Sequence, residues 1–152
     1  MLQRIQSVYL LAVLILSCVM LFLPWASYTG NYVSYEFGCM GLCIYKDTLV
    51  TVLNSWALTA VAAIVPILAL ISIFLYKKRI LQIRFCIFNL LLMASFYALF
   101  AVYFYIISQQ GMKLNQLFIS LVFPLINMIF TYLAIRAIKK DEELLRSMSR
   151  LR

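Results

Sequence analysis

Residues 85–112, FCIFNLLLMASFYALFAVYFYIISQQGM, contain no charged side chain. A helix needs about 20 apolar residues to cross the hydrocarbon of a bilayer, and this stretch is longer than that. It is a continuous apolar run with no alternation of apolar and polar residues, which favours a helix over a strand of a membrane barrel. We therefore predict a membrane-spanning helix over residues 85–108.

Further apolar stretches lie on both sides of this one. Residues 48–76 and 114–135 are also free of charge, and so are residues 5–35, although their apolar part ends near Trp25. The predicted fold class is an all-α membrane protein, built as an antiparallel four-helix transmembrane bundle in a single domain over residues 1–152. The four spans are predicted at about 5–26, 50–76, 85–108 and 115–137.

The composition supports a membrane protein and argues against an enzyme. Hydrophobic residues make up 66% of the 152 residues, against about 45–50% in soluble domains, and a chain of this size could not bury the excess. Histidine is absent, which removes the commonest general base and the commonest zinc ligand. We predict no catalytic residue, no metal site and no cofactor.

The basic residues divide unevenly between the two sides of the predicted bundle. The N-terminus, the loop at 77–84 and the C-terminal tail carry 11 of the 13 Lys and Arg residues, and only Lys46 and Lys113 lie on the other side. The positive-inside rule then places both termini in the cytoplasm. The cations lie beside anionic headgroups, and nucleic acid is not a predicted partner because no basic domain stands free of the membrane.

The outward loop at 27–49 is predicted to form a small extracytoplasmic β-hairpin or sheet over the outer ends of the helices. Gly38 and Gly41 bracket a turn within it. The residues before this turn include several that favour strands, namely Tyr32, Val33, Tyr35 and Phe37.

Two cysteines, Cys39 and Cys43, share this outward loop. An oxidising compartment would permit a disulfide between them, and Gly41 could supply the tight turn that so short a loop requires. Their spacing is C-x3-C and not the C-x-x-C redox motif. A structural disulfide and two free thiols both stay open, whereas a redox or metal role is disfavoured.

Small residues recur at four-residue spacing in two predicted spans. Ser55, Thr59 and Ala63 follow this pattern in the second span, and Ala94 and Ala98 follow it in the third. Such residues let membrane helices approach closely. Packing within the bundle is the favoured interpretation, and an oligomer contact is the alternative.

Two prolines and three asparagines interrupt the apolar spans. Pro66 and Pro124 lie near the middles of the second and fourth spans, where each is predicted to kink its helix. Asn54, Asn89 and Asn127 are expected to form hydrogen bonds between helices, with a substrate pocket as the less favoured alternative.

Residues 138–152 are predicted to leave the membrane as a cytoplasmic helical extension. Apolar residues recur there at helical spacing, with basic residues beside them. This predicted contact surface comprises Leu144, Leu145, Met148 and Leu151 together with Arg146 and Arg150. It either docks on a partner protein or lies on the membrane surface.

Both ends of the chain resemble one family. The N-terminal MLQRIQSVYLL, at residues 1–11, and the C-terminal RAIKKDEELLRS, at residues 136–147, followed by SRLR at 149–152, carry the likeness. The sequence is similar to domain of unknown function 4293, a family of small four-span inner-membrane proteins of Gram-negative bacteria. The resemblance implies a multi-pass protein of the bacterial inner membrane, and it implies no activity.

Three functional hypotheses follow. The favoured one is a non-enzymatic accessory or scaffold subunit of a larger inner-membrane complex, with the lipid bilayer and other membrane subunits as partners and homo-oligomerisation left open. The second is a small oligomeric transporter or channel for a neutral or apolar solute. The third, an intramembrane thiol oxidoreductase using Cys39 and Cys43, is the least favoured.

Overall fold

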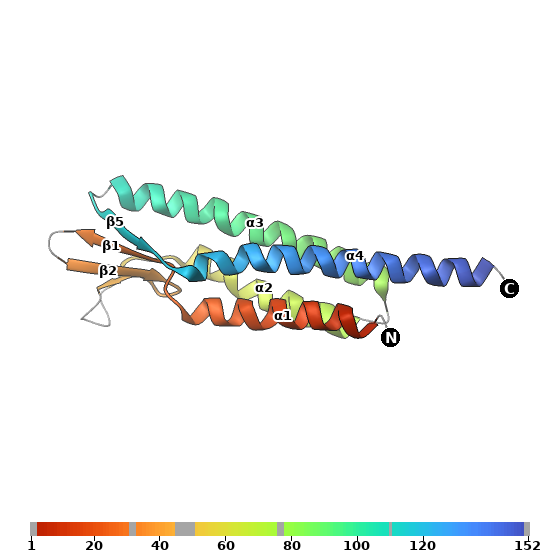
Figure 1. Ribbon diagram of the computed structural model, residues 1–152. Coiled ribbons are helices and arrows are strands. Elements are labelled where there is room, and N and C mark those ends of the chain that lie inside the picture. The colour runs from red at the N-terminus through yellow and green to blue at the C-terminus, as the bar shows by residue number, and fades with distance from the viewer. Residues whose placement is uncertain (1–2, 31–32, 45–50, 76–77, 110, 151–152) are drawn as a thin grey trace.

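The molecule is elongated, and four long helices in the described part of the chain run along its axis (Figure 1). The computed structural model describes residues 3–30, 33–44, 51–75, 78–109 and 111–150, with side chains for 7–30, 33–44, 54–75, 78–109 and 111–142. The helices are α1 (Gln3–Phe22), α2 (Trp56–Phe74), α3 (Arg79–Gln109) and α4 (Phe123–Arg150).

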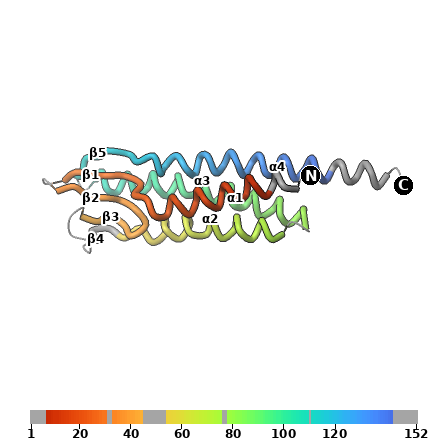
Figure 2. Tube along the Cα trace, turned by 60° about the horizontal axis from the view of Figure 1, so that its bottom comes forward, coloured from red at the N-terminus to blue at the C-terminus, as the bar shows by residue number. Residues whose placement is uncertain are grey.

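Each helix contacts two of the others. α1 packs on α2 and α4, and α3 packs on the same two helices. The start of α1 and the end of α4 lie toward the same end of the molecule, and α4 runs on past the other helices there (Figures 1 and 2). The predicted helical extension from residue 138 is confirmed along the backbone as far as Arg150.

The opposite end of the molecule is a five-stranded antiparallel sheet with the strand order β4-β3-β2-β1-β5. The predicted turn between Gly38 and Gly41 is confirmed, because these two residues form the closing pair of a hairpin. Gly41 has a φ of 104°, a conformation that favours glycine. The strands are β1 (Ala26–Gly30), β2 (Val33–Gly38), β3 (Gly41–Ile44), β4 (Thr51–Leu53) and β5 (Lys113–Leu117).

One face of the sheet packs on the outer half of α3, which extends alongside the strands to their far end (Figure 1). Phe37 of β2 lies 6.1 Å from Phe100 and 5.8 Å from Tyr103, measured between ring centroids. Tyr28 of β1 lies 6.5 Å from Phe104. Because aromatic side chains bury large apolar areas, these contacts make the sheet part of the hydrophobic core.

The predicted fold class, an all-α four-helix transmembrane bundle, is therefore wrong. The structure is α+β, because the sheet takes β4 from the segment before α2 and β5 from the segment between α3 and α4, in addition to β1 to β3, and it shares its core with α3. Three described segments are long and apolar enough to cross a membrane, namely α2, α3 and Ile119–Glu142. The described apolar stretch of α1, Ser7–Phe22, is shorter.

Two predicted helix starts are also wrong, for the same reason. Residues 51–53 pair with β3 as a strand, so α2 begins only at Trp56. Residues 113–117 pair with β1, and a short 3-10 helix, η2 (Ile119–Val122), separates them from α4. Apolar runs of this length do not distinguish strand from helix, and the available partner strand decides the outcome.

Pro66 and Pro124 lie at different places in their helices. Pro66 lies inside α2, as predicted. Pro124 is the second residue of α4 and not its middle. Proline is tolerated in the first helical turn because that N–H has no intrahelical partner, so the predicted kink at Pro124 is wrong.

Candidate functional site

The junction between the helices and the sheet is built around Trp25, which is fully buried. Its Nε1 donates a hydrogen bond to the carbonyl of Met20 at 3.2 Å. Its ring makes edge contacts with Phe37 and Phe96, with centroids 5.8 and 5.4 Å away. The Phe118 N–H donates to the Trp25 carbonyl at 3.1 Å, so one residue ties α1, the sheet, α3 and the segment before η2 together.

The start of α2 is fastened to the β2–β3 hairpin by two hydroxyl groups. Ser55 donates to the carbonyl of Gly38 at 3.0 Å, and Thr59 donates to the carbonyl of Cys39 at 2.6 Å. The four-residue spacing of Ser55 and Thr59 predicts a close approach between helices. The structure adds that their hydroxyls satisfy two carbonyls of a tight turn, which sequence spacing alone does not reveal.

The η2 segment closes the junction from the other side. Ser120 donates its hydroxyl hydrogen bond to the carbonyl of Pro24, and Tyr97 of α3 donates to the carbonyl of Leu121 at 2.6 Å. Buried backbone carbonyls need such donors. The junction is therefore a hydrogen-bonded seam.

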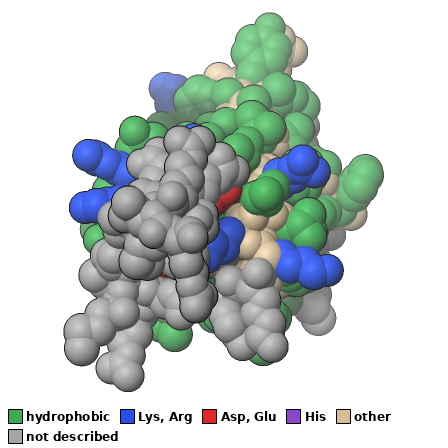
Figure 3. Space-filling model, turned by 90° about the vertical axis from the view of Figure 1, so that its right-hand side faces the viewer, with side chains coloured by type: hydrophobic (Ala, Val, Ile, Leu, Met, Phe, Trp, Pro, Cys, Tyr) green, Lys and Arg blue, Asp and Glu red, His purple; other side chains and the backbone are tan. Residues whose placement is uncertain are grey.

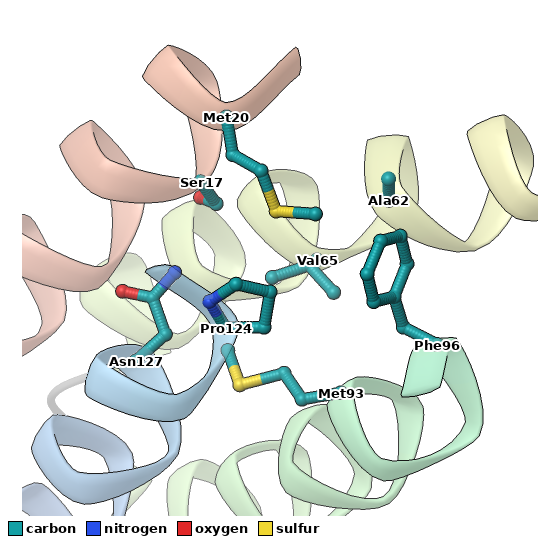
Figure 4. Close-up of a pocket in the computed structure, with 8 residues that line it drawn as sticks. All are labelled: Ser17, Met20, Ala62, Val65, Met93, Phe96, Pro124 and Asn127. Atoms are coloured by element: carbon teal, nitrogen blue, oxygen red, sulfur yellow. The ribbon is translucent and has the colours of Figure 1, made fainter. Parts of the chain in front are cut away.

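A small cavity of about 10 Å³ lies just inside this seam (Figure 4). All four helices contribute to its lining, with Ser17 and Asn127 as the polar members among methionine, aromatic and aliphatic side chains (Figure 4). A single water needs at least about 10–15 Å³. The cavity therefore admits one water at most and has no room for a solute.

Two buried asparagines have oxygens without a hydrogen-bond partner among the described residues. Asn89 and Asn127 are both 1% exposed, and the Oδ1 atom of each lacks a partner there. Asn54 is exposed just before α2, and neither it nor Asn89 lines the small cavity. The structure thus gives no shared pocket to the three asparagines that sequence reasoning grouped together.

The two loop cysteines are free thiols. The Sγ of Cys39 donates to the carbonyl of Leu21 at 2.8 Å, and burial raises the pKa of this thiol. Cys39 lies in the turn, whereas Cys43 pairs with Glu36 two strand positions beyond the Gly38–Gly41 pair. A strand rises about 3.3 Å per residue, so this register separates the two cysteines by more than a relaxed disulfide spans.

Cys39, Cys43 and Glu36 do share an open concavity of about 310 Å³ beside the end of α1. No group of three or more His, Cys, Asp or Glu side chains in the part of the chain that the structure describes is arranged to hold a metal ion. The concavity thus brings two thiols and one carboxylate to the surface.

The outer part of α3 carries an exposed apolar face, which we call the α3 outer face and define as Val102, Tyr105 and Ile106. Their exposed fractions are 54%, 64% and 40%. Only 17% of the apolar window of α3 is buried, against 39% for α2. Ala94 and Ala98, predicted to pack between helices, are exposed on α3 as well.

The end of the molecule opposite the sheet is ringed by Lys and Arg side chains (Figure 3). Arg79, at the start of α3, forms an ion pair with Asp141 of α4, with Nη2 and Oδ2 3.4 Å apart. The predicted contact residues Leu144, Leu145, Arg146, Met148 and Arg150 follow on α4, and their side chains, like Leu151 as a whole, lie outside the described residues.

Together, the helices and the sheet define an α+β protein in which three helical segments have the length and composition to cross a membrane. A family model described as Domain of unknown function (DUF4293) matches residues 2–151. The chain therefore belongs to this family. No curated protein matches the chain.

Proposed function

We propose that this chain is a non-enzymatic, multi-pass protein of a bacterial inner membrane that serves as an accessory or scaffold subunit of a larger membrane complex. In this proposal α1 to α4 each cross the bilayer, both termini lie in the cytoplasm, and the sheet lies on the outer side. The observation that carries the proposal is the α3 outer face, an apolar surface beyond the level at which the other helices end.

The proposed orientation is supported by the position of the chain ends and of the charges. α1 begins and α4 ends toward the same end of the molecule (Figure 1), which fits an even number of crossings. Basic side chains surround that end (Figure 3), and basic residues mark the cytoplasmic side of membrane proteins. We expect a C-terminal tag to be protected from external protease in spheroplasts. Digestion of the tag would indicate the opposite orientation.

The outer limit of the bilayer is suggested by the exposed aromatic side chains at the helix ends. Phe22 ends α1 at 88% exposure and Trp56 begins α2 at 70% exposure, and Trp side chains favour the membrane interface. Phe96 of α3 lies beside Trp25, three residues after the end of α1, with ring centroids 5.4 Å apart, and so belongs at the same level.

The α3 outer face lies beyond this level. From Phe100 to Gln109 the helix rises about 14 Å, at about 1.5 Å per residue, and its other side is occupied by contacts with the sheet. With the outer limit of the bilayer at the level of Phe22 and Trp56, lipid tails end below this face and not at residue 108, where the predicted span ends. Exposed apolar surface in water is typical of a protein interaction site. A partner subunit with an apolar surface just outside the outer leaflet would cover it.

Mild extraction from native membranes, followed by measurement of particle size, tests the proposal. We expect the chain to co-purify with at least one other protein, and we expect replacement of Val102, Tyr105 and Ile106 by Ser to release it. Replacement of the lipid-level residues Ile87 and Leu91 by Ser is the matched control and should leave the assembly intact. Migration of the unaltered chain as a lone monomer would contradict the proposal.

A small oligomeric transporter or channel for a neutral or apolar solute is the alternative. The cavity inside the seam has only about 10 Å³, so any path would have to form between copies of the chain. Solute flux into liposomes that is lost on Asn89→Leu or Asn127→Leu would favour this alternative over the subunit role.

A further inference from the structure

We propose that α4 carries a binding site for the phosphate of an anionic phospholipid in the cytoplasmic leaflet. The site consists of Arg136, Lys139 and Lys140, with Tyr132 one turn closer to the membrane centre. This inference rests on the membrane placement proposed above. The inference adds a ligand class and a face of α4 to that placement.

The three cations and Tyr132 lie on one face of α4. Residues 132, 136, 139 and 140 recur at helical spacing, and together with Ile135 they line a concavity of about 500 Å³. The side chains of Arg136, Lys139 and Lys140 are all exposed. Three cations around one concavity suit a phosphate, which accepts hydrogen bonds from both guanidinium and ammonium groups.

The two carboxylates of this region whose side chains the structure describes, Asp141 and Glu142, lie on other sides of α4. Asp141 is directed to Arg79 of α3, at 3.4 Å, and Glu142 lines a different concavity with Lys78 and Arg79. The concavity of the three cations is therefore lined by positive charge, a tyrosine and an isoleucine, without a described acidic residue.

The same face continues toward the membrane centre as an exposed apolar surface. Leu125, Ile129 and Tyr132 are 51%, 59% and 59% exposed. From Ile129 to Lys140 the helix rises about 16 Å at about 1.5 Å per residue, and one leaflet of a bilayer contributes about 15 Å of hydrocarbon. The face thus has the length of one phospholipid, with apolar side chains along the acyl chains and cations at the headgroup.

An anionic lipid fits this site better than a zwitterionic one. Each Lys or Arg near the surface of an anionic leaflet adds attraction, whereas the choline of a zwitterionic headgroup cancels the charge of the phosphate. A free phosphate ion shares the headgroup chemistry but makes no use of the exposed apolar side chain of Ile129. Lipid and ion can therefore be separated by experiment.

Native mass spectrometry of the full chain in detergent tests the site. Phosphatidylglycerol and phosphatidylcholine with identical acyl chains are added separately, and inorganic phosphate is added as a third probe. We expect phosphatidylglycerol to bind at least about tenfold more strongly than phosphatidylcholine, with each single substitution Arg136→Gln, Lys139→Gln or Lys140→Gln reducing its binding about fivefold. Arg84→Gln, which removes an exposed cation near the start of α3, is the matched control and should change binding less than twofold.

Equal binding of the two lipids, or an equal loss in Arg84→Gln and in the α4 variants, would overturn the proposal. Displacement of phosphatidylglycerol by millimolar inorganic phosphate would also overturn it, because the site would then recognise an ion without the lipid. None of these results tests the α3 outer face, so the lipid site and the proposed subunit role can fail independently of each other. The single variants keep the test valid if a triple variant does not fold.

Discussion

The Thr59 hydroxyl lies 2.6 Å from the carbonyl of Cys39, and this bond fastens the first turns of α2 to the tip of the β2–β3 hairpin. The same hydroxyl is 3.1 Å from the carbonyl of Ser55 in its own helix. The tertiary contact matters more for stability, because the Ser55 carbonyl already receives the backbone N–H of Thr59 at 3.0 Å.

Thr59→Val should therefore destabilise the protein by about 1 kcal/mol, since it leaves the Cys39 carbonyl without this donor at nearly constant volume. Thr59→Ser should remain close to the unaltered chain. Thr131→Val is a matched control, because the Thr131 hydroxyl bonds only within its own helix, to Asn127 at 2.7 Å. Thermal unfolding in detergent measures all three, and equal losses in the two valine variants would remove the special role of Thr59.

The burial of Tyr28 should make the stability of the protein depend on pH in the alkaline range. Burial raises the pKa of its phenol from 10.0 to about 12, and its hydroxyl has no hydrogen-bond partner among the described residues. The folded state holds its proton more tightly than the unfolded state, so this stability contribution is complete below about pH 10 and is lost as the pH rises toward 12.

Tyr28→Phe should remove that alkaline loss, because the titrating group is gone. It should also leave stability at pH 8 unchanged or raise it by up to about 1 kcal/mol, since an unpaired buried hydroxyl is removed. Tyr105→Phe, on the exposed α3 outer face, is the control. Unfolding midpoints measured from pH 8 to 11.5 decide the outcome, and an alkaline loss as steep in Tyr28→Phe as in the unaltered chain would contradict the prediction.

The sequence predicts the long helices and the first-loop hairpin, but it misses the two edge strands of the sheet, β4 and β5, for a physical reason. Charge-free runs reveal helices because hydrophobic length is a local property. β5, with the sequence KLNQL at 113–117, has no alternation of its own and becomes a strand through its pairing with β1. The hydroxyl bonds of Ser55 and Ser120 likewise depend on turns that are distant in the sequence, so neither could be predicted from spacing.

The sequence also does not show which sides of α3 are buried and which are exposed. Composition identifies residues 85–108 as apolar, but it cannot tell which side meets the sheet, which meets lipid and which remains open. Phe96 is buried and Tyr105 is exposed, although both belong to the same apolar run. The way α3 packs against Trp25 and the sheet decides which of its apolar residues are buried.

The Arg79–Asp141 pair should hold α4 against the start of α3 where α4 leaves the other helices. Asp141→Asn should destabilise this region by about 1–3 kcal/mol, because the partly buried Arg79 guanidinium loses its charged partner. The exchanged pair, Arg79→Asp with Asp141→Arg, should recover part of the loss in a double-mutant cycle. Hydrogen exchange along α4 measures the effect, and additive losses in the cycle would show that the two residues do not interact.

The two tryptophans should report opposite environments. Trp25 is fully buried in the seam, whereas Trp56 is 70% exposed at the start of α2. In bilayers of phospholipid brominated on its acyl chains, the Trp25→Phe variant should lose most of its fluorescence, because the remaining Trp56 faces lipid in the proposed membrane placement. Trp56→Phe should be quenched at least about threefold less. Equal quenching of both variants would contradict either the burial of Trp25 or the lipid exposure of Trp56.

Cys39 and Cys43 should remain reduced even in an oxidising compartment, because the hairpin register keeps them too far apart for a relaxed disulfide. Burial raises the pKa of the Cys39 thiol, so less of it is thiolate at neutral pH and it should react with maleimide more slowly than a free cysteine peptide. Cys39→Ser and Cys43→Ser variants separate the two signals in mass spectrometry after alkylation. A loss of about 2 mass units, the mass of two hydrogen atoms, on oxidation, abolished by either substitution, would show that the hairpin opens far enough to form the bond.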